Sequence, residues 1–133
     1  MRRDFSLPDE DLAWLESRSS PYELVCENGV LRVVLDEYVV PAGYDHQTVR
    51  ANVRIDPGYP DAQIDMVYFY PGLALLSRRA LVAVSPCEQF DGKTWQRWSR
   101  HRTGANPWRP GIDNLSVHFE LVQEWLSREL RKT

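Results

Sequence analysis

Apolar residues recur at helical spacing near both ends of this chain and alternate with polar residues in between. Leu12 and Leu15 mark the buried stripe of a first helix, which we expect from about Pro8 to Arg18. Ser6 can cap this helix, and a proline is tolerated in its first turn. Near the C-terminus, Asp113 can cap a second helix that has a longer apolar stripe. That stripe contains Phe119, Val122, Trp125, Leu126 and Leu130.

The segment between these helices predicts four strands. Tyr22 to Val40 is typical of a β-hairpin, because two β-rich runs meet at Asn28-Gly29, a pair suited to positive φ. Residues 49–55 alternate between apolar and polar side chains, so the third strand should have one face in solvent. Ile64 to Tyr70 supplies a fourth strand, which Pro71-Gly72 ends. Four successive strands with short connections form an antiparallel meander.

The stretch from Leu73 to Pro110 lacks periodicity and contains scattered proline and glycine. We therefore expect a long irregular loop, and such loops in compact domains often carry function. The fold class is α+β: an N-terminal helix, a four-stranded antiparallel meander, the long irregular loop and a C-terminal helix. The chain has 133 residues, of which 43% are hydrophobic, and this suits a single domain over residues 1–133.

Charge and hydropathy exclude several classes of protein. A formal net charge of -3 disfavours a general nucleic-acid binder, although the acid-free basic stretch from Lys93 to Arg109 could accept an acidic partner. No apolar run approaches the roughly 18 residues of a membrane span. The positive N-terminus is not followed by the apolar segment of a signal peptide. We expect a cytoplasmic protein that binds neither nucleic acid nor membrane.

Two short motifs resemble those of the ubiquitin-conjugating (UBC) fold. Pro57-Gly58-Tyr59-Pro60 follows the third predicted strand and is similar to the Tyr-Pro turn of UBC proteins. Trp108-Arg109-Pro110 precedes the C-terminal helix, like the Trp-x-Pro that follows the UBC active-site loop. The run from Trp95 to His101, followed by Trp108 to Leu115, resembles the bacterial UBC-like proteins of prokaryotic UBC family E. The resemblance covers roughly Pro8 to Leu130.

This resemblance implies a UBC-like fold and a role in a bacterial ubiquitin-like modification pathway. A protein of this kind takes a ubiquitin-like modifier from an activating-enzyme-like protein as an ester and passes it to a target. A JAB-type peptidase is the further protein that the resemblance implies in the same pathway. No cofactor is implied.

The chain departs from the UBC pattern at two places that carry chemistry. The UBC cysteine lies about eight residues before the Trp of Trp-x-Pro, and here that position is Arg100, between Ser99 and His101. The UBC His-Pro-Asn, whose Asn is thought to stabilise the oxyanion, is replaced by Tyr70-Pro71-Gly72. These departures leave open a second hypothesis, that the chain is a non-catalytic module that binds and positions the modifier or the activating enzyme.

Ser99 and His101 are candidate catalytic residues, as nucleophile and base. Their side chains point to the same side only if the segment is extended; in a helix they would point apart. Arg97 or Arg100 could then counter the negative charge that develops on the substrate. The alternative is that Ser99 and His101 only bind backbone in a tightly turned loop.

Cys87 is a rival catalytic nucleophile, because a thiolate suits the transfer chemistry and the residue is expected to be exposed. Adjacent Glu88 would disfavour the thiolate, and Cys87 lies twelve residues before Ser99. Cys26 shares a predicted strand face with apolar residues, so we expect it in the core. With only these two cysteines, no disulfide framework is indicated.

Three tryptophans lie close in sequence to three arginines, and these six are the candidate partner-binding residues: Trp95, Arg97, Trp98, Arg100, Trp108 and Arg109. Trp and Arg are the residue types enriched in binding hot spots, which favours a partner surface. The alternative is that arginines stacked on indoles only hold a long loop in place. His46 and His118 have no ligand spacing with each other or with a cysteine, so we expect no metal site.

Overall fold

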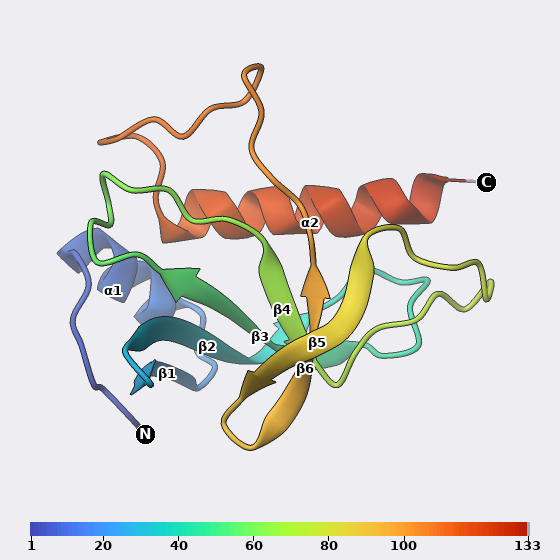
Figure 1. Cartoon of the computed structure of the whole chain (residues 1–133), viewed down its shortest axis with the longest axis horizontal. Coiled ribbons are helices and arrows are strands. Elements are labelled where there is room, and N and C mark those ends of the chain that lie inside the picture. Colours follow the sequence, from blue (N-terminus) through green and yellow to red (C-terminus); the bar gives the residue numbers. More distant parts are fainter. Residues whose placement is uncertain (133) are drawn as a thin grey trace.

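Two helices and six strands make up the protein in the computed structural model, which describes residues 1–132 (Figure 1). In chain order they are α1 (Asp9–Ser17), β1 (Tyr22–Glu27), β2 (Val30–Val39), β3 (Thr48–Ile55), β4 (Val67–Tyr70), β5 (Val84–Phe90), β6 (Lys93–Trp98) and α2 (Leu115–Arg131). The strands form one antiparallel sheet in the order β1-β2-β3-β4-β6-β5. The α+β class, the two helices and the antiparallel meander are therefore confirmed.

The first hairpin forms where the sequence predicts it. Asn28 and Gly29 connect β1 to β2 with φ angles of 52° and 77°, as a two-residue turn that matches the twist of a hairpin requires. Glycine adopts such angles without steric cost, and asparagine tolerates them better than most residues. The hairpin places the β-branched residues of β2 in the middle of the sheet.

The prediction of four strands is wrong, because the segment from Leu73 to Pro110 contains a second hairpin, β5–β6, that extends the sheet to six strands. Asp91 and Gly92 form its turn, with φ angles of 54° and 71°. Pro86 breaks the β pattern of the sequence, but the structure tolerates it because β5 is an edge strand with a bulge beside this proline. The run from Trp95 to Trp98 thus belongs to a strand and not to a loop.

Helix α2 packs its apolar stripe against one face of the sheet (Figure 1). The stripe residues Phe119, Val122, Trp125 and Leu126 are all at most 5% exposed. Asn114, not the predicted Asp113, is the N-cap residue, and its side chain accepts a hydrogen bond from the Val117 N–H. Asp113 instead accepts a hydrogen bond of 2.6 Å from the backbone N–H of Arg109.

Helix α1 begins at Asp9 after the N-cap residue Pro8, and no side chain caps it within residues 1–132. The predicted cap by Ser6 is therefore wrong, while the helix itself lies within the predicted bounds. Trp14 of α1 stacks on Phe119 of α2 with 5.7 Å between the ring centroids. The two helices meet through this aromatic pair.

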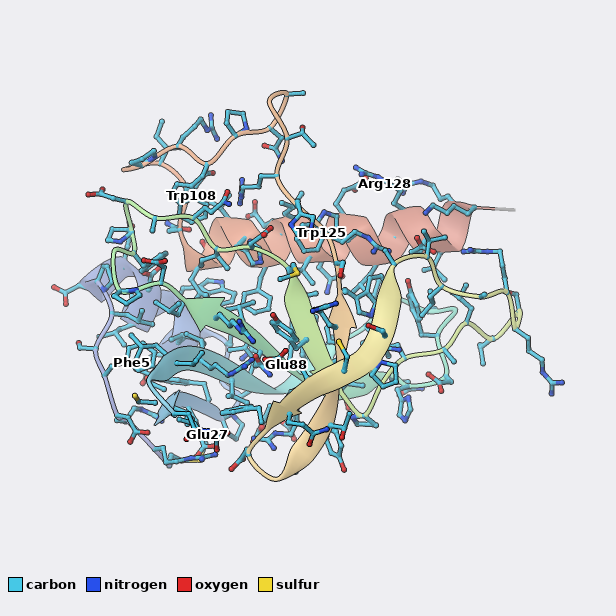
Figure 2. The ribbon with its side chains drawn as sticks, viewed as in Figure 1. Phe5, Glu27, Glu88, Trp108, Trp125 and Arg128 are labelled. Atoms are coloured by element: carbon cyan, nitrogen blue, oxygen red, sulfur yellow. The ribbon has the colours of Figure 1, made fainter. Side chains whose placement is uncertain are left out.

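A second, smaller core lies on the opposite face of the sheet, beneath the β5–β6 hairpin. It consists of Val25, Val34, Tyr68, Phe90 and Trp95. The expectation of one solvent face along β3 is wrong at Asn52, which is fully buried because the hairpin covers it. Figure 2 shows Glu88 of the hairpin over the middle of the sheet.

Candidate functional site

The segment that replaces the UBC cysteine follows β6 through a local bulge. Val67 pairs with Trp98, but the next hydrogen bond runs from the Met66 N–H to the Arg100 carbonyl, so the chain just after β6 contains one extra residue relative to the chain before β4. That residue is Ser99, which lies in a three-residue turn closed by a 3.0 Å hydrogen bond from the Arg100 N–H to the Trp98 carbonyl. The Ser99 N–H donates to the Ala83 carbonyl at 3.0 Å, which ties the turn to the segment before β5.

The bulge places His101 beside Asp65, a residue that the sequence analysis did not single out. The His101 Nδ1 lies 2.7 Å from Asp65 Oδ2, and 62% of the His101 side chain is exposed. No hydrogen bond joins Ser99 to His101 anywhere in the described chain. The imidazole is thus oriented by a carboxylate, which is how a base is held in many catalytic sites, but it is not bonded to the serine.

Arg100 turns toward helix α2. Its Nη2 lies 3.1 Å from an oxygen of Glu129, whose side chain is only 2% exposed, and its guanidinium lies 5.0 Å from the centre of the Trp98 ring. Arg79 and Lys132 also bind this carboxylate, at 3.2 and 2.5 Å. Burial alone would raise the pKa of Glu129, but the hydrogen bonds from Lys132 and Arg79 lower it below the usual value. Arg100 therefore anchors the end of β6 to α2.

Trp95 and Trp98 have no exposed surface and belong to the cores on the two faces of the sheet. The Trp95 indole N–H donates to the Phe90 carbonyl at 3.0 Å, and that of Trp98 donates to Gln96 Oε1 at 3.0 Å. Direct contact with a partner would require these side chains to leave the core. Both indoles are also stacked by arginines, with Arg50 5.6 Å from the Trp95 centroid.

Trp108 connects the two UBC-like motifs. Its indole N–H donates to the Pro60 carbonyl at 2.9 Å, and its ring lies 6.1 Å from that of Tyr59. The buried guanidinium of Arg102 lies over the Trp108 ring, 4.8 Å from the ring centroid. The Tyr-Pro turn and the Trp-x-Pro segment therefore touch, and Trp108 remains partly exposed above α2 (Figure 2).

The arginines of the candidate partner surface differ in accessibility. Arg109 is the most open, with 59% of its side chain exposed and its Nε 3.5 Å from Asp113. Arg97 is half-buried on β6, and its Nε is a buried atom that lacks a hydrogen-bond partner among residues 1–132. Arg109 and Trp108 are the members of the set most available to another molecule.

Cys87 is an exposed free thiol in the bulge of β5. Ser85 Oγ lies within hydrogen-bond distance of its Sγ, at 3.3 Å. The adjacent Glu88 binds Arg32 and Arg54 and makes no hydrogen bond to the thiol. The sequence-based expectation that Cys26 lies in the core is wrong: it is exposed at the hairpin end of the edge strand β1.

The structure does not bring Cys87 together with Ser99 and His101. Cys87 follows Pro86, which pairs with Gln96, and Gln96 lies five residues before His101. No hydrogen bond joins Cys87 to Ser99 or His101 within residues 1–132; the side-chain partner of the Cys87 thiol is Ser85. The catalytic candidates thus form two separate places: the Ser99–His101 segment and the bulge of β5.

Gln96 holds the Tyr70-Pro71-Gly72 segment that replaces His-Pro-Asn. Its side-chain amide accepts a hydrogen bond from the Leu73 N–H at 2.8 Å and donates to the Leu73 carbonyl at 2.9 Å. A Cβ at Gly72 would lie only 3.2–3.3 Å from the Gln96 side chain. This close approach explains why glycine suits the position.

Residues 1–132 contain no group of three or more His, Cys, Asp and Glu side chains arranged to hold a metal ion. Neither of the helices in this range is both long enough and apolar enough to cross a membrane.

Comparison with known proteins identifies the family. The family model described as Prokaryotic E2 family E, where E2 denotes ubiquitin-conjugating-like proteins, matches residues 7–129. No curated protein and no solved structure gives a significant match. The matched range includes the Tyr-Pro turn, the Ser99–His101 segment and the Trp-x-Pro segment. The chain therefore belongs to prokaryotic E2 family E, as the resemblance of its Trp- and Arg-rich run indicates.

Proposed function

We propose that this protein accepts a ubiquitin-like modifier from an activating-enzyme-like partner as an ester and passes it to a target protein. The pathway would operate in the bacterial cytoplasm, with a JAB-type peptidase acting in the same pathway. Membership of an E2-like family supports this role in general terms. Ser99 is the residue that we propose as the carrier of the ester.

One observation carries the choice of Ser99. By spacing, Ser99 lies next to Arg100, which occupies the position of the UBC cysteine, and two residues from His101, which is hydrogen-bonded to Asp65. In the loading step, Ser99 Oγ bonds to the carbonyl carbon of the modifier's activated C-terminus, the bond to the previous carrier breaks, and a base removes the serine proton. Cys87 is the second candidate, because its thiol is exposed.

The test is adduct formation with the purified activating enzyme, the modifier and ATP. An oxyester on Ser99 should resist thiols, be cleaved by hydroxylamine, and disappear in Ser99→Ala. Loss in Cys87→Ala, together with sensitivity to thiols, would instead assign the cysteine. Ser127→Ala, on helix α2, is the matched control and should load like the wild type. Absence of any adduct from the wild type would exclude the enzymatic role.

A second candidate function is that of a non-catalytic module that positions the modifier or the activating enzyme. The observation in its favour is that His101 is bonded to Asp65, and Ser99 Oγ has no hydrogen bond to a base within residues 1–132. In this case a Ser99→Ala, Cys87→Ala double variant should bind the partners and support modification in cells as well as the wild type. Loss of modification in that variant excludes the non-catalytic role.

A further inference from the structure

The segment after β6 arches over the outward side of helix α2 before it returns to the start of that helix (Figure 1). Between the arch and the helix lies a hollow of about 190 Å³. Its lining residues are His101, Thr103, Asn106, Leu121, Trp125 and Arg128. Figure 2 labels Trp125 and Arg128 on α2, with Arg128 toward the C-terminal end of the helix. His101, whose side chain is 62% exposed, makes one wall of the hollow reachable from solvent.

Asp65 fixes the orientation of His101. Its Oδ2 lies 2.7 Å from His101 Nδ1, and the segments before β4 and after β6 that carry the two residues are joined by the hydrogen bond from the Met66 N–H to the Arg100 carbonyl. The other oxygen, Oδ1, is buried and has no hydrogen-bond partner in the described chain. An ionised carboxylate can only accept hydrogen bonds, so the neutral imidazole carries its hydrogen on Nδ1. The lone pair of Nε2 is then available to accept a proton.

We propose that this hollow is the acceptor site, where a primary amine of the target enters, and that Asp65 is the positioning residue that keeps His101 ready to take the proton of that amine. This inference rests on the proposed function with Ser99 as the ester carrier. In this proposal His101 takes the proton of the incoming amine, not that of Ser99. This is consistent with the hydrogen bond that turns the imidazole toward Asp65.

The position of Ser99 makes this transfer sterically reasonable. Two residues of extended chain span at most about 7 Å, so an ester on Ser99 is held close to His101 by the backbone alone. The amine nitrogen bonds to the ester carbonyl carbon, and the bond from that carbon to Ser99 Oγ breaks. The proton lost by nitrogen passes to His101 Nε2, and the imidazolium returns it to the departing serine oxygen. Atoms and charge balance without a further reactant.

The lining of the hollow suits an amine on an apolar stem, as in lysine. Leu121, which is partly exposed, offers apolar surface for methylene groups, beside the 5% of Trp125 that is exposed. Arg128 also lines the hollow, but its Nη2 lies 3.5 Å from Glu124, so its charge is partly neutralised. A cation without such a partner would repel a protonated amine more strongly.

Two variants and a matched pair of controls test the proposal. The protein is loaded with modifier, the activating enzyme is then removed, and discharge onto free L-lysine is followed. Loading is measured first in His101→Gln and Asp65→Asn, so that discharge is compared per loaded molecule. Discharge should slow by about 100-fold in His101→Gln, which is the lower end of the range for loss of a general base. In Asp65→Asn, where the base is present but less well oriented, discharge should slow by about 10-fold. His46→Gln and Asp45→Asn alter the other His–Asp pair, at 2.9 Å, and should discharge normally.

The imidazole tautomer provides a readout that does not depend on activity. In ¹⁵N NMR spectra of neutral His101, the wild type should show hydrogen on Nδ1, and Asp65→Asn should shift the population toward hydrogen on Nε2. If the wild type loads and Asp65→Asn discharges at the wild-type rate with an unchanged tautomer, this inference is wrong while the proposed function stands. If the wild type never loads, both fail. His101→Gln changes an exposed side chain and keeps the test decisive should Asp65→Asn not fold.

Discussion

Arg32 and Glu88 form an ion pair of 2.7 Å beneath the β5–β6 hairpin, with only 4% and 14% of their side chains exposed. Arg54 binds the same carboxylate, and Arg32 also donates to Asn52 at 2.9 Å. Burial alone would raise the pKa of Glu88, but hydrogen bonds from Arg54 and Arg32 outweigh it, and the pKa lies below the usual value. The charged group thus ties the hairpin that carries Cys87 to the strands on which it lies.

Removal of Glu88 should therefore destabilise the whole domain. We expect Glu88→Ala to lower the free energy of unfolding by about 3–5 kcal/mol, because it leaves the buried Arg32 without its carboxylate. Urea denaturation followed by tryptophan fluorescence measures this. Glu124→Ala is the control: Glu124 is 47% exposed and pairs with Arg131 at 3.0 Å, and such surface pairs contribute at most about 1 kcal/mol. Equal losses in the two variants would contradict the structural role of the pair.

The hairpin β5–β6 shows how far the sequence predicts this fold. The turn signal was present, because Asp91-Gly92 is the same kind of pair as Asn28-Gly29, which identified the first hairpin. Two features hid the strand β5 in the sequence. Pro86 interrupts it, and its residues before Phe90 are not buried, so they need not alternate between apolar and polar. An edge strand with a bulge needs neither strict alternation nor every backbone donor. What distinguishes it from a loop is its pairing with β6, which in turn pairs with the distant strand β4.

The sequence indicates where a candidate site lies but not its geometry. The spacing from Trp108 identified the segment around Ser99, whereas the hydrogen bond between His101 and Asp65 depends on the one-residue bulge at Ser99. A shift of one residue reverses which side chains meet across a sheet, and no local pattern records it. Asp65, 36 positions away in the sequence, therefore gave no sign of its role.

Both cysteines should react with thiol reagents in the native protein. Cys26 and Cys87 are free and exposed, although the sequence placed Cys26 in the core. Titration with a chromogenic disulfide should detect two reactive thiols in the native protein and the same two after denaturation. Cys26→Ser and Cys87→Ser should each lower the native count by one thiol. If Cys26→Ser leaves the native count unchanged, the end of β1 is more protected than this structure has it.

Asn114 should stabilise helix α2 measurably. Its Oδ1 accepts hydrogen bonds from the Val117 N–H at 3.1 Å and from the Ser116 hydroxyl at 2.9 Å. We expect Asn114→Ala to cost about 0.5–2 kcal/mol in urea denaturation, the usual range for loss of an N-cap side chain. Ser6→Ala is the control, because Ser6 resembles a cap in the sequence but precedes the observed N-cap of α1 by two residues. A larger loss in Ser6→Ala than in Asn114→Ala would be inconsistent with these helix starts.

His118 should make the fold sensitive to mild acid. Burial lowers its pKa to about 4, and its Nε2 donates to the Met66 carbonyl at 2.9 Å. The unfolded chain has a pKa of about 6.5, so between pH 6.5 and 4 the unfolded state binds a proton that the folded state does not. Stability therefore falls as the pH falls through this window, by about 3 kcal/mol in total.

His118→Gln keeps a donor for Met66 but cannot titrate. The difference in unfolding free energy between pH 7 and pH 4.5 should be clearly smaller in this variant than in the wild type. His46→Gln, which alters a histidine on the surface, should keep the wild-type difference, because His46 is not in the core. A pH dependence in His118→Gln as steep as that of the wild type would rule out His118 as the acid-sensitive group.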